Sequence, residues 1–135
     1  MPGYSGTPLA RKLGYKGGTR AYLDSAPAEY RSWLEPLPKG VTFLRKPDEG
    51  LDLVHLFCTE ATALEVKLAL YLPRIKADGM IWVSWPKRAS KVPTDVTEDV
   101  IRSLALPLGL VDVKVCAVSD VWSGLKLVIR KENRR

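Results

Sequence analysis

Histidine and cysteine are scarce in this sequence of 135 residues, which contains one histidine and two cysteines. A Cys–His catalytic pair or a metal site needs several such side chains at suitable spacing. Cys58 and Cys116 lie far apart in apolar segments, and the sequence has no CxxC motif. We therefore expect buried, reduced thiols, no metal site and no disulfide framework.

Long apolar runs are absent as well. No segment approaches the ~18 apolar residues that a membrane-spanning helix requires. The first residues, MPGYSGTPLARK, lack the apolar core of a signal peptide. A cytoplasmic protein with no membrane partner is expected. The 46% hydrophobic and 27% charged composition is that of a folded domain, which excludes extensive disorder.

The sequence also has no nucleophile elbow, no Walker phosphate loop and no paired catalytic carboxylates. It does carry a formal net charge of +6, which favours acidic partners such as phosphates or nucleic acid. Part of this excess lies in the C-terminal residues Arg130, Lys131, Arg134 and Arg135, which are also consistent with a solubilising tail. Composition alone leaves both interpretations open.

Strand-like and helix-like segments alternate along the chain. The segment 51–58, LDLVHLFC, has the continuous apolar character of a strand buried on both faces, and 60–72 has helical periodicity. The last third alternates apolar and polar residues in 111–117 and 125–130, which predicts an antiparallel hairpin. Further segments are expected as helices at 7–14, 27–34 and 97–106 and as strands at 19–23, 41–44 and 80–84.

This order predicts an α/β fold: one three-layer, Rossmann-like domain over residues 1–135. Its mostly parallel sheet of about six strands would end in an antiparallel hairpin, with helices on both faces. An N-terminal helical arm, 1–16, and a basic tail, 131–135, would flank it. His55 alternates with Leu53 and Phe57 in the central strand, so we expect a neutral, hydrogen-bonded core histidine.

Three segments resemble class I methyltransferase domains: LPRIKADGMIWVSWP, the closing GLVDVKV…WSGLKLVIRK, and LDLVHLF. The resemblance implies a shortened Rossmann sheet ordered 2-1-3-4-6-5, with S-adenosylmethionine as the cofactor. Over nearly its full length the chain is similar to an uncharacterised bacterial domain family without an assigned function. The motifs that carry this similarity are Gly3–Gly14, Trp85–Ser90, Thr94–Val100 and Gly109–Val118.

The sequence departs from the methyltransferase pattern at two positions. The turn after the first strand, Leu23–Pro27, has no glycine, although close approach of backbone to a cofactor favours glycine there. Arg45 and Lys46 follow the second strand, where methyltransferases usually have an acidic residue for the ribose hydroxyls. Both departures favour a non-enzymatic or degenerate binding domain over an active methyltransferase.

The candidate ligand site is the loop between the 80–84 strand and the following helix, because ligands bind outside the carboxyl ends of strands in open α/β sheets. Cations, hydroxyls and a helix start would favour a phosphate or carboxylate. Trp85 and Trp122 are candidate pocket walls, and Asp24 is a further polar anchor. Alternatively, the loop is only a solvated connection in which Asp95 and Glu98 form a capping pair. The candidate residues of the loop are Lys87, Arg88, Ser90, Lys91, Thr94 and Asp95.

Three functional hypotheses follow. The main one is a non-enzymatic or degenerate Rossmann-like domain that binds an anionic small molecule or nucleotide at this edge. The second is an S-adenosylmethionine-dependent, methyltransferase-like enzyme with an atypical cofactor loop, anchored by Asp24, Thr94 and Asp95. The third is a basic interaction or nucleic-acid-binding module, which comes last because no nucleic-acid-binding motif is present.

Overall fold

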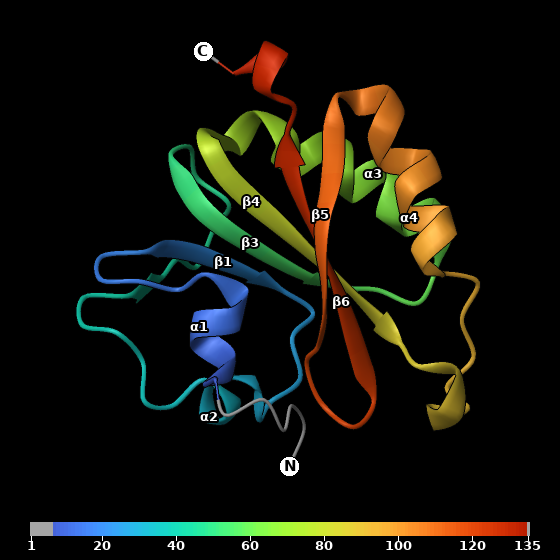
Figure 1. Cartoon of the computed structure of the whole chain (residues 1–135), viewed down its shortest axis with the longest axis horizontal. Helices are drawn as coiled ribbons and strands as arrows, with labels where there is room; N and C mark the ends of the chain where they lie inside the picture. Colours follow the sequence, from blue (N-terminus) through green and yellow to red (C-terminus); the bar gives the residue numbers. More distant parts are fainter. Residues whose placement is uncertain (1–6, 135) are drawn as a thin grey trace.

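The sheet has six strands in the order β2-β1-β3-β4-β6-β5 (Figure 1). The computed structural model describes residues 7–134; residues 1–6 of the predicted arm and residue 135 of the predicted tail lie outside this range. Strands β1 to β4 are parallel to one another, and β6 is antiparallel to both of its neighbours. The predicted α/β fold class and strand order are confirmed. The strands are β1 Arg20–Asp24, β2 Thr42–Phe43, β3 Leu51–Phe57, β4 Ile75–Pro86, β5 Leu110–Ala117 and β6 Trp122–Ile129.

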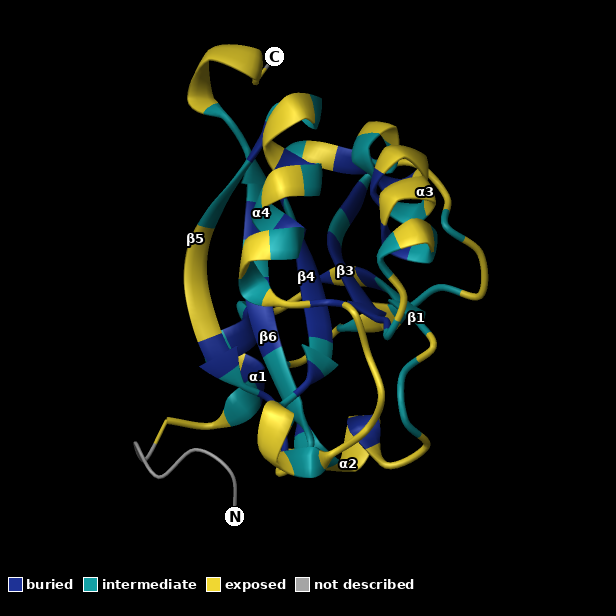
Figure 2. Cartoon of the chain, turned by 90° about the vertical axis from the view of Figure 1, so that its right-hand side faces the viewer, coloured by how far each residue is buried: buried dark blue, intermediate teal, exposed yellow. Residues whose placement is uncertain are grey.

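Helices cover both faces of this sheet (Figures 1 and 2). Helices α3, Ala61–Tyr71, and α4, Glu98–Ala105, pack on one face. The short helices α1, Leu9–Leu13, and α2, Tyr30–Trp33, pack on the other. None of the helices within residues 7–134 is long and apolar enough to cross a membrane. Single 3₁₀ turns occupy Leu72–Arg74, Arg88–Ser90, Leu106–Leu108 and Lys131–Asn133.

Strand β3 is buried on both faces, as its continuous apolar sequence predicts. Val54 and Leu56 belong to the core beneath α3 and α4, whereas Leu53 and Phe57 belong to the core beneath α1 and α2. This alternation follows from the two-residue period of a strand. The two helical layers therefore leave the ends of the central strands as the places where a ligand can reach them.

Three local expectations need correction. The helix expected over 7–14 begins only at Leu9, after Pro8, and has no side-chain cap, and Gly14 ends it in the left-handed conformation. The helix predicted over 27–34 is only one turn long, Tyr30–Trp33. The strand expected over 80–84 is longer than predicted, because β4 already begins at Ile75 and includes Ala77–Gly79. The pairing of β4 with β3 changes register there, and a Cβ atom on Gly79 would lie 3.0 Å from the Leu51 carbonyl oxygen.

A chain of hydrogen bonds crosses the core on the α1 and α2 side. The Tyr15 and Tyr30 hydroxyls are 2.9 Å apart, the Tyr30 hydroxyl lies 2.7 Å from His55 Nδ1, and His55 Nε2 lies 2.7 Å from Ser84 Oγ. His55 is fully buried, and this burial lowers its pKa to about 3. The predicted neutral core histidine is confirmed, and the network joins α2 to β3 and β4.

His55 should make stability depend on pH. The unfolded chain binds this proton near pH 6.5, whereas the folded protein binds it only near pH 3, so the free energy of unfolding falls as pH decreases through that interval. Between about pH 5 and 6.5, above the range of the carboxylates, the slope should approach about 1.4 kcal/mol per pH unit. Urea unfolding across this interval measures it.

Because the sequence has a single histidine, His55→Gln should remove this slope even if the variant is less stable. An unchanged slope in the variant would contradict a neutral His55 in the folded state.

Candidate functional site

The strand order changes direction between β1 and β3. The chain leaves β1 for β2 on one side and returns to place β3 on the other side, so the connections after β1 and β3 diverge. Such a switch point opens a crevice at the carboxyl ends of the strands. A cavity of about 280 Å³ lies there, between Ser25 after β1, Cys58 and Thr59 after β3, Lys67 of α3 and Trp122 of β6.

Asp24 ends β1 beside this cavity and is already paired. Its carboxylate accepts hydrogen bonds from Lys67 Nζ at 2.9 Å, from Ser25 Oγ at 2.8 Å and from the Tyr71 hydroxyl. Burial alone would raise the pKa of Asp24, but these hydrogen bonds hold it below its usual value. Asp24 is therefore an ionised carboxylate that ties β1 to α3.

Cys58 borders the cavity as a thiol. Only 6% of its surface is exposed, and burial raises its pKa to about 12. A thiol with this pKa is protonated at neutral pH and is a poor nucleophile. Cys116 is also buried, and its pKa is likewise raised by burial. Within residues 7–134 no group of three or more potential metal ligands comes together.

Thr94 and Asp95 fasten their loop to helix α3. The Thr94 hydroxyl donates to the Thr59 carbonyl at 2.7 Å, and Asp95 Oδ1 accepts from the Ala61 amide at 2.7 Å. Asp95 thus caps α3, a helix that begins after Glu60 without a side-chain cap of its own. The predicted Asp95–Glu98 capping pair is wrong, because Asp95 serves a different helix.

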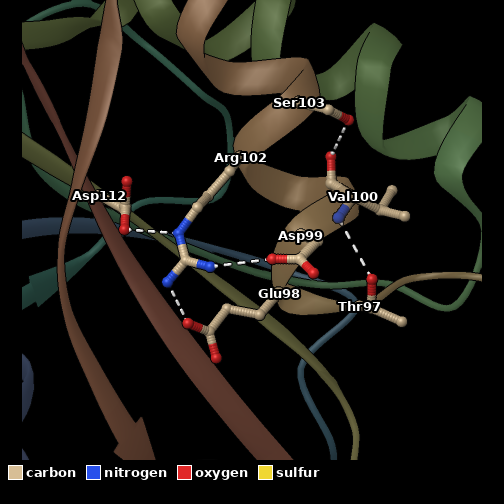
Figure 3. Close-up of polar contacts among 7 residues, drawn as sticks. All are labelled: Thr97, Glu98, Asp99, Val100, Arg102, Ser103 and Asp112. Atoms are coloured by element: carbon tan, nitrogen blue, oxygen red, sulfur yellow. Dashed lines mark hydrogen bonds and ion pairs between the residues drawn. The ribbon is translucent and has the colours of Figure 1, made fainter.

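Helix α4 is capped by Thr97, whose Oγ1 accepts from the Val100 amide at 3.2 Å (Figure 3). Glu98 and Arg102 form an ion pair along this helix. Arg102 also reaches Asp99 at 3.2 Å and Asp112 of β5 at 2.8 Å, so it links α4 to the edge strand (Figure 3). These side chains are partly or fully exposed and have a structural role.

The basic part of the loop is mostly exposed: Arg88 and Lys91 are exposed, and Lys87 is half-buried. Its backbone is held by the Lys87 amide, which donates to the Val121 carbonyl at 2.7 Å, and Ser90 Oγ donates to the Lys87 carbonyl at 2.7 Å. Among residues 7–134, Lys87, Arg88 and Lys91 have no ion-pair partner. None of the three lines the switch-point cavity. The loop therefore has two parts. Thr94 and Asp95 are fixed by hydrogen bonds to the start of α3 and the residues before it, whereas the cationic half, Lys87 to Lys91, has basic side chains that form no ion pair among the described residues.

The two candidate pocket walls, Trp85 and Trp122, lie on opposite faces of the sheet. Trp82 is buried in the α1 and α2 core, where its Nε1 donates to the Leu13 carbonyl at 2.7 Å. Trp85 packs on the α3 and α4 face. Trp122 packs on the opposite face, with its ring 5.1 Å from that of Phe57. Trp122 is thus the predicted wall that borders the cavity.

The sequence interpretation missed Ser25, Cys58, Thr59, Glu60 and Lys67, which also line the cavity. Four of them directly follow β1 or β3, and a position just after the carboxyl end of a strand is the sequence feature that could have predicted them as ligand-site residues. Lys67 lies in the middle of α3, and no local pattern marks it as a cavity residue.

Comparison with solved structures identifies the fold. A putative type 11 methyltransferase from Sulfolobus solfataricus matches with a TM-score of 0.66 at 12% identity, over 94% of this chain and 92% of that chain. The ribosomal protein L11 methylase from Lactobacillus delbrueckii subsp. bulgaricus matches with 0.56 at 12% identity, over 90% and 75%. The fold is methyltransferase-like.

A third neighbour is fibrillarin from Aeropyrum pernix, in complex with natively bound S-adenosyl-L-methionine, with a TM-score of 0.57 at 14% identity over 94% of this chain and 71% of that chain. At these identities the likeness concerns the fold alone. No protein-family model matches the sequence, and no curated protein matches it at a significant level. The proposed bacterial domain family stays a prediction.

The capping role of Asp95 can be tested by substitution. Asp95→Ala should lower the free energy of unfolding by about 0.5–2 kcal/mol, because it removes the side-chain acceptor of the Ala61 amide at the start of α3. Asp95→Asn keeps an acceptor oxygen and should restore most of the loss. Asp99→Ala is the control, since the Asp99 side chain is 95% exposed. Equal urea midpoints for Asp95→Ala and Asp99→Ala would contradict the cap.

Proposed function

We propose that this chain is a methyltransferase-like protein that binds S-adenosylmethionine, or a closely related nucleoside, in the switch-point cavity. The observation that carries the proposal is the position of the cavity, between the carboxyl ends of β1 and β3 in a sheet of methyltransferase-like order. This is the second of the three functional hypotheses, and the structural neighbours support it better than they support a non-enzymatic domain.

The cavity contains groups that suit a zwitterionic nucleoside. Lys67 uses one of its three donors on Asp24 and has others for a ligand carboxylate. Glu60 is exposed at the cavity wall, and its carboxylate has no hydrogen-bond or ion-pair partner among residues 7–134, so it can accept from an amino group or ribose hydroxyl. Trp122 supplies an aromatic surface for a purine base.

These roles differ from the arrangement that the resemblance to methyltransferases implies. Asp24, after β1, is engaged by Lys67 and Tyr71, and Arg45 and Lys46 after β2 are exposed cations. Glu60, after β3, takes the acidic role instead. The bound cofactor would supply an activated methyl group, while the residues of this chain bind and orient it.

Thermal unfolding with S-adenosylhomocysteine tests the proposal. A ligand at a hundred times its dissociation constant stabilises a protein by ~2.7 kcal/mol, which should raise the midpoint of this domain by several degrees. Glu60→Gln should weaken binding about tenfold, as expected for loss of one charge-assisted hydrogen bond. The matched control is Glu65→Gln, an exposed position on the same helix that does not line the cavity.

A saturable shift that Glu60→Gln weakens and Glu65→Gln leaves intact supports the site. The absence of any saturable shift at millimolar ligand would refute the proposal.

The cationic half of the loop supports a second candidate, the anion-binding domain. Three neighbouring cations without acidic partners are available to a phosphate or carboxylate, and Lys91 holds the left-handed conformation with φ at 60°. Because their side chains make no ion pair in the fold, they can be removed without unfolding the protein.

The double variant Lys87→Ala, Lys91→Ala should abolish binding of a nucleoside diphosphate while leaving the thermal midpoint unchanged. Calorimetric titration with ADP measures the binding, and Lys46→Ala, on the far side of the sheet, is the control. Binding that survives the double change would make this loop a connector only.

A further inference from the structure

A second cleft, of about 590 Å³, lies between α1 and the edge strand β5. The charged side chains that line it are Arg11 and Lys12 of α1 and Lys114 of β5, and no acidic side chain is among its lining residues. It shares no residue with the switch-point cavity and none with the Lys87–Asp95 loop. The middle of β5 is exposed beside it (Figure 2).

A fourth cation lies next to this cleft. Lys114 and Lys126 are direct partners across β5 and β6, so their side chains leave the sheet on the same face. Like charges in this position destabilise a sheet. Lys126 is half-buried, and its pKa is lowered, first by burial and then by the neighbouring charge of Lys114.

The fold fixes this group of cations in place. Lys114 Nζ donates to the Lys12 carbonyl at 3.1 Å, a contact between residues 102 positions apart, which accounts for one of the three donors of the ammonium group. Among residues 7–134, none of Arg11, Lys12, Lys114 and Lys126 forms an ion pair. The protein therefore holds four cations together without internal compensation.

We propose that this α1–β5 cleft binds a small phosphate-bearing molecule through Arg11, Lys12 and Lys114. A guanidinium and two ammonium groups provide charge-assisted donors, and a guanidinium can hold two phosphate oxygens at once. The concave shape of the site favours a compact ligand over an extended strand. The bound anion would supply negative charge at a cleft whose lining residues include no acidic side chain.

The first experiment asks whether the cluster is under electrostatic strain without a ligand. Lys126→Gln removes one of the opposed charges and keeps a side chain of similar length. At low salt without phosphate, it should raise the thermal midpoint by about 1–3 °C. Lys46→Gln, in the loop beyond β2 at the opposite edge of the sheet, should leave the midpoint unchanged. A lower midpoint for Lys126→Gln would overturn this part of the inference.

The second experiment measures the thermal midpoint against pyrophosphate concentration, with sodium chloride of equal ionic strength as the reference. Multivalent anions also stabilise proteins without a site, but that effect does not saturate. The wild type and Lys46→Gln should show a saturable rise. In the double variant Lys12→Gln, Lys114→Gln the apparent dissociation constant should increase at least about tenfold, as expected for two lost charge-assisted contacts.

Identical curves for all variants, or a rise that never saturates, would overturn the proposal. The same double variant is also titrated with a single-stranded oligonucleotide. Oligonucleotide binding that depends on Lys12 and Lys114, without any saturable effect of pyrophosphate, would overturn the small-ligand assignment in favour of a nucleic-acid surface. The Lys87→Ala, Lys91→Ala variant should respond to pyrophosphate as the wild type does, which would show that pyrophosphate binds in this cleft and not at the 87–91 loop.

Discussion

Burial of β3 on both faces is the constraint on which the rest of the structure depends. A strand whose side chains are apolar on both sides has to be covered by a layer on each face, and α3 with α4 and α1 with α2 supply these layers. Only the ends of the central strands then remain within reach of a ligand. The switch-point cavity lies at such an end, where the last residues of the neighbouring strands β1 and β3 lie side by side.

The buried polar side chains form hydrogen bonds with one another, and these bonds connect different helices and strands. The Tyr15–Tyr30–His55–Ser84 chain satisfies every polar side-chain atom in its path, and no buried side-chain nitrogen or oxygen among the described residues lacks a partner. At the cavity, the pairing of Asp24 with Lys67 compensates both charges while leaving donors on the lysine. A site built this way suits a ligand that carries both signs of charge.

The net charge of +6 is distributed unevenly over the fold. Some cations have structural partners: Arg102 holds α4 to β5, and Arg134 donates to the Ile129 carbonyl at 2.9 Å. Most of the others have no ion-pair partner within residues 7–134, and two groups of these are the 87–91 loop and the α1–β5 cleft. A cleft lined by charge of one sign, such as the α1–β5 cleft, favours an anionic partner.

The sequence by itself determined the fold class and the buried histidine, because apolar periodicity and strand burial are local properties of the chain. The strand order followed from the resemblance to methyltransferase domains, and the structure has the same order. The tertiary structure alone decided which polar residues meet. Asp95 caps a helix 34 positions before it, Lys67 pairs with a carboxylate 43 positions away, and Lys114 reaches α1 across 102 positions. No local sequence pattern predicts such pairings. They form because the register of the strands and the packing of the helices bring side chains that are distant in sequence within hydrogen-bond distance.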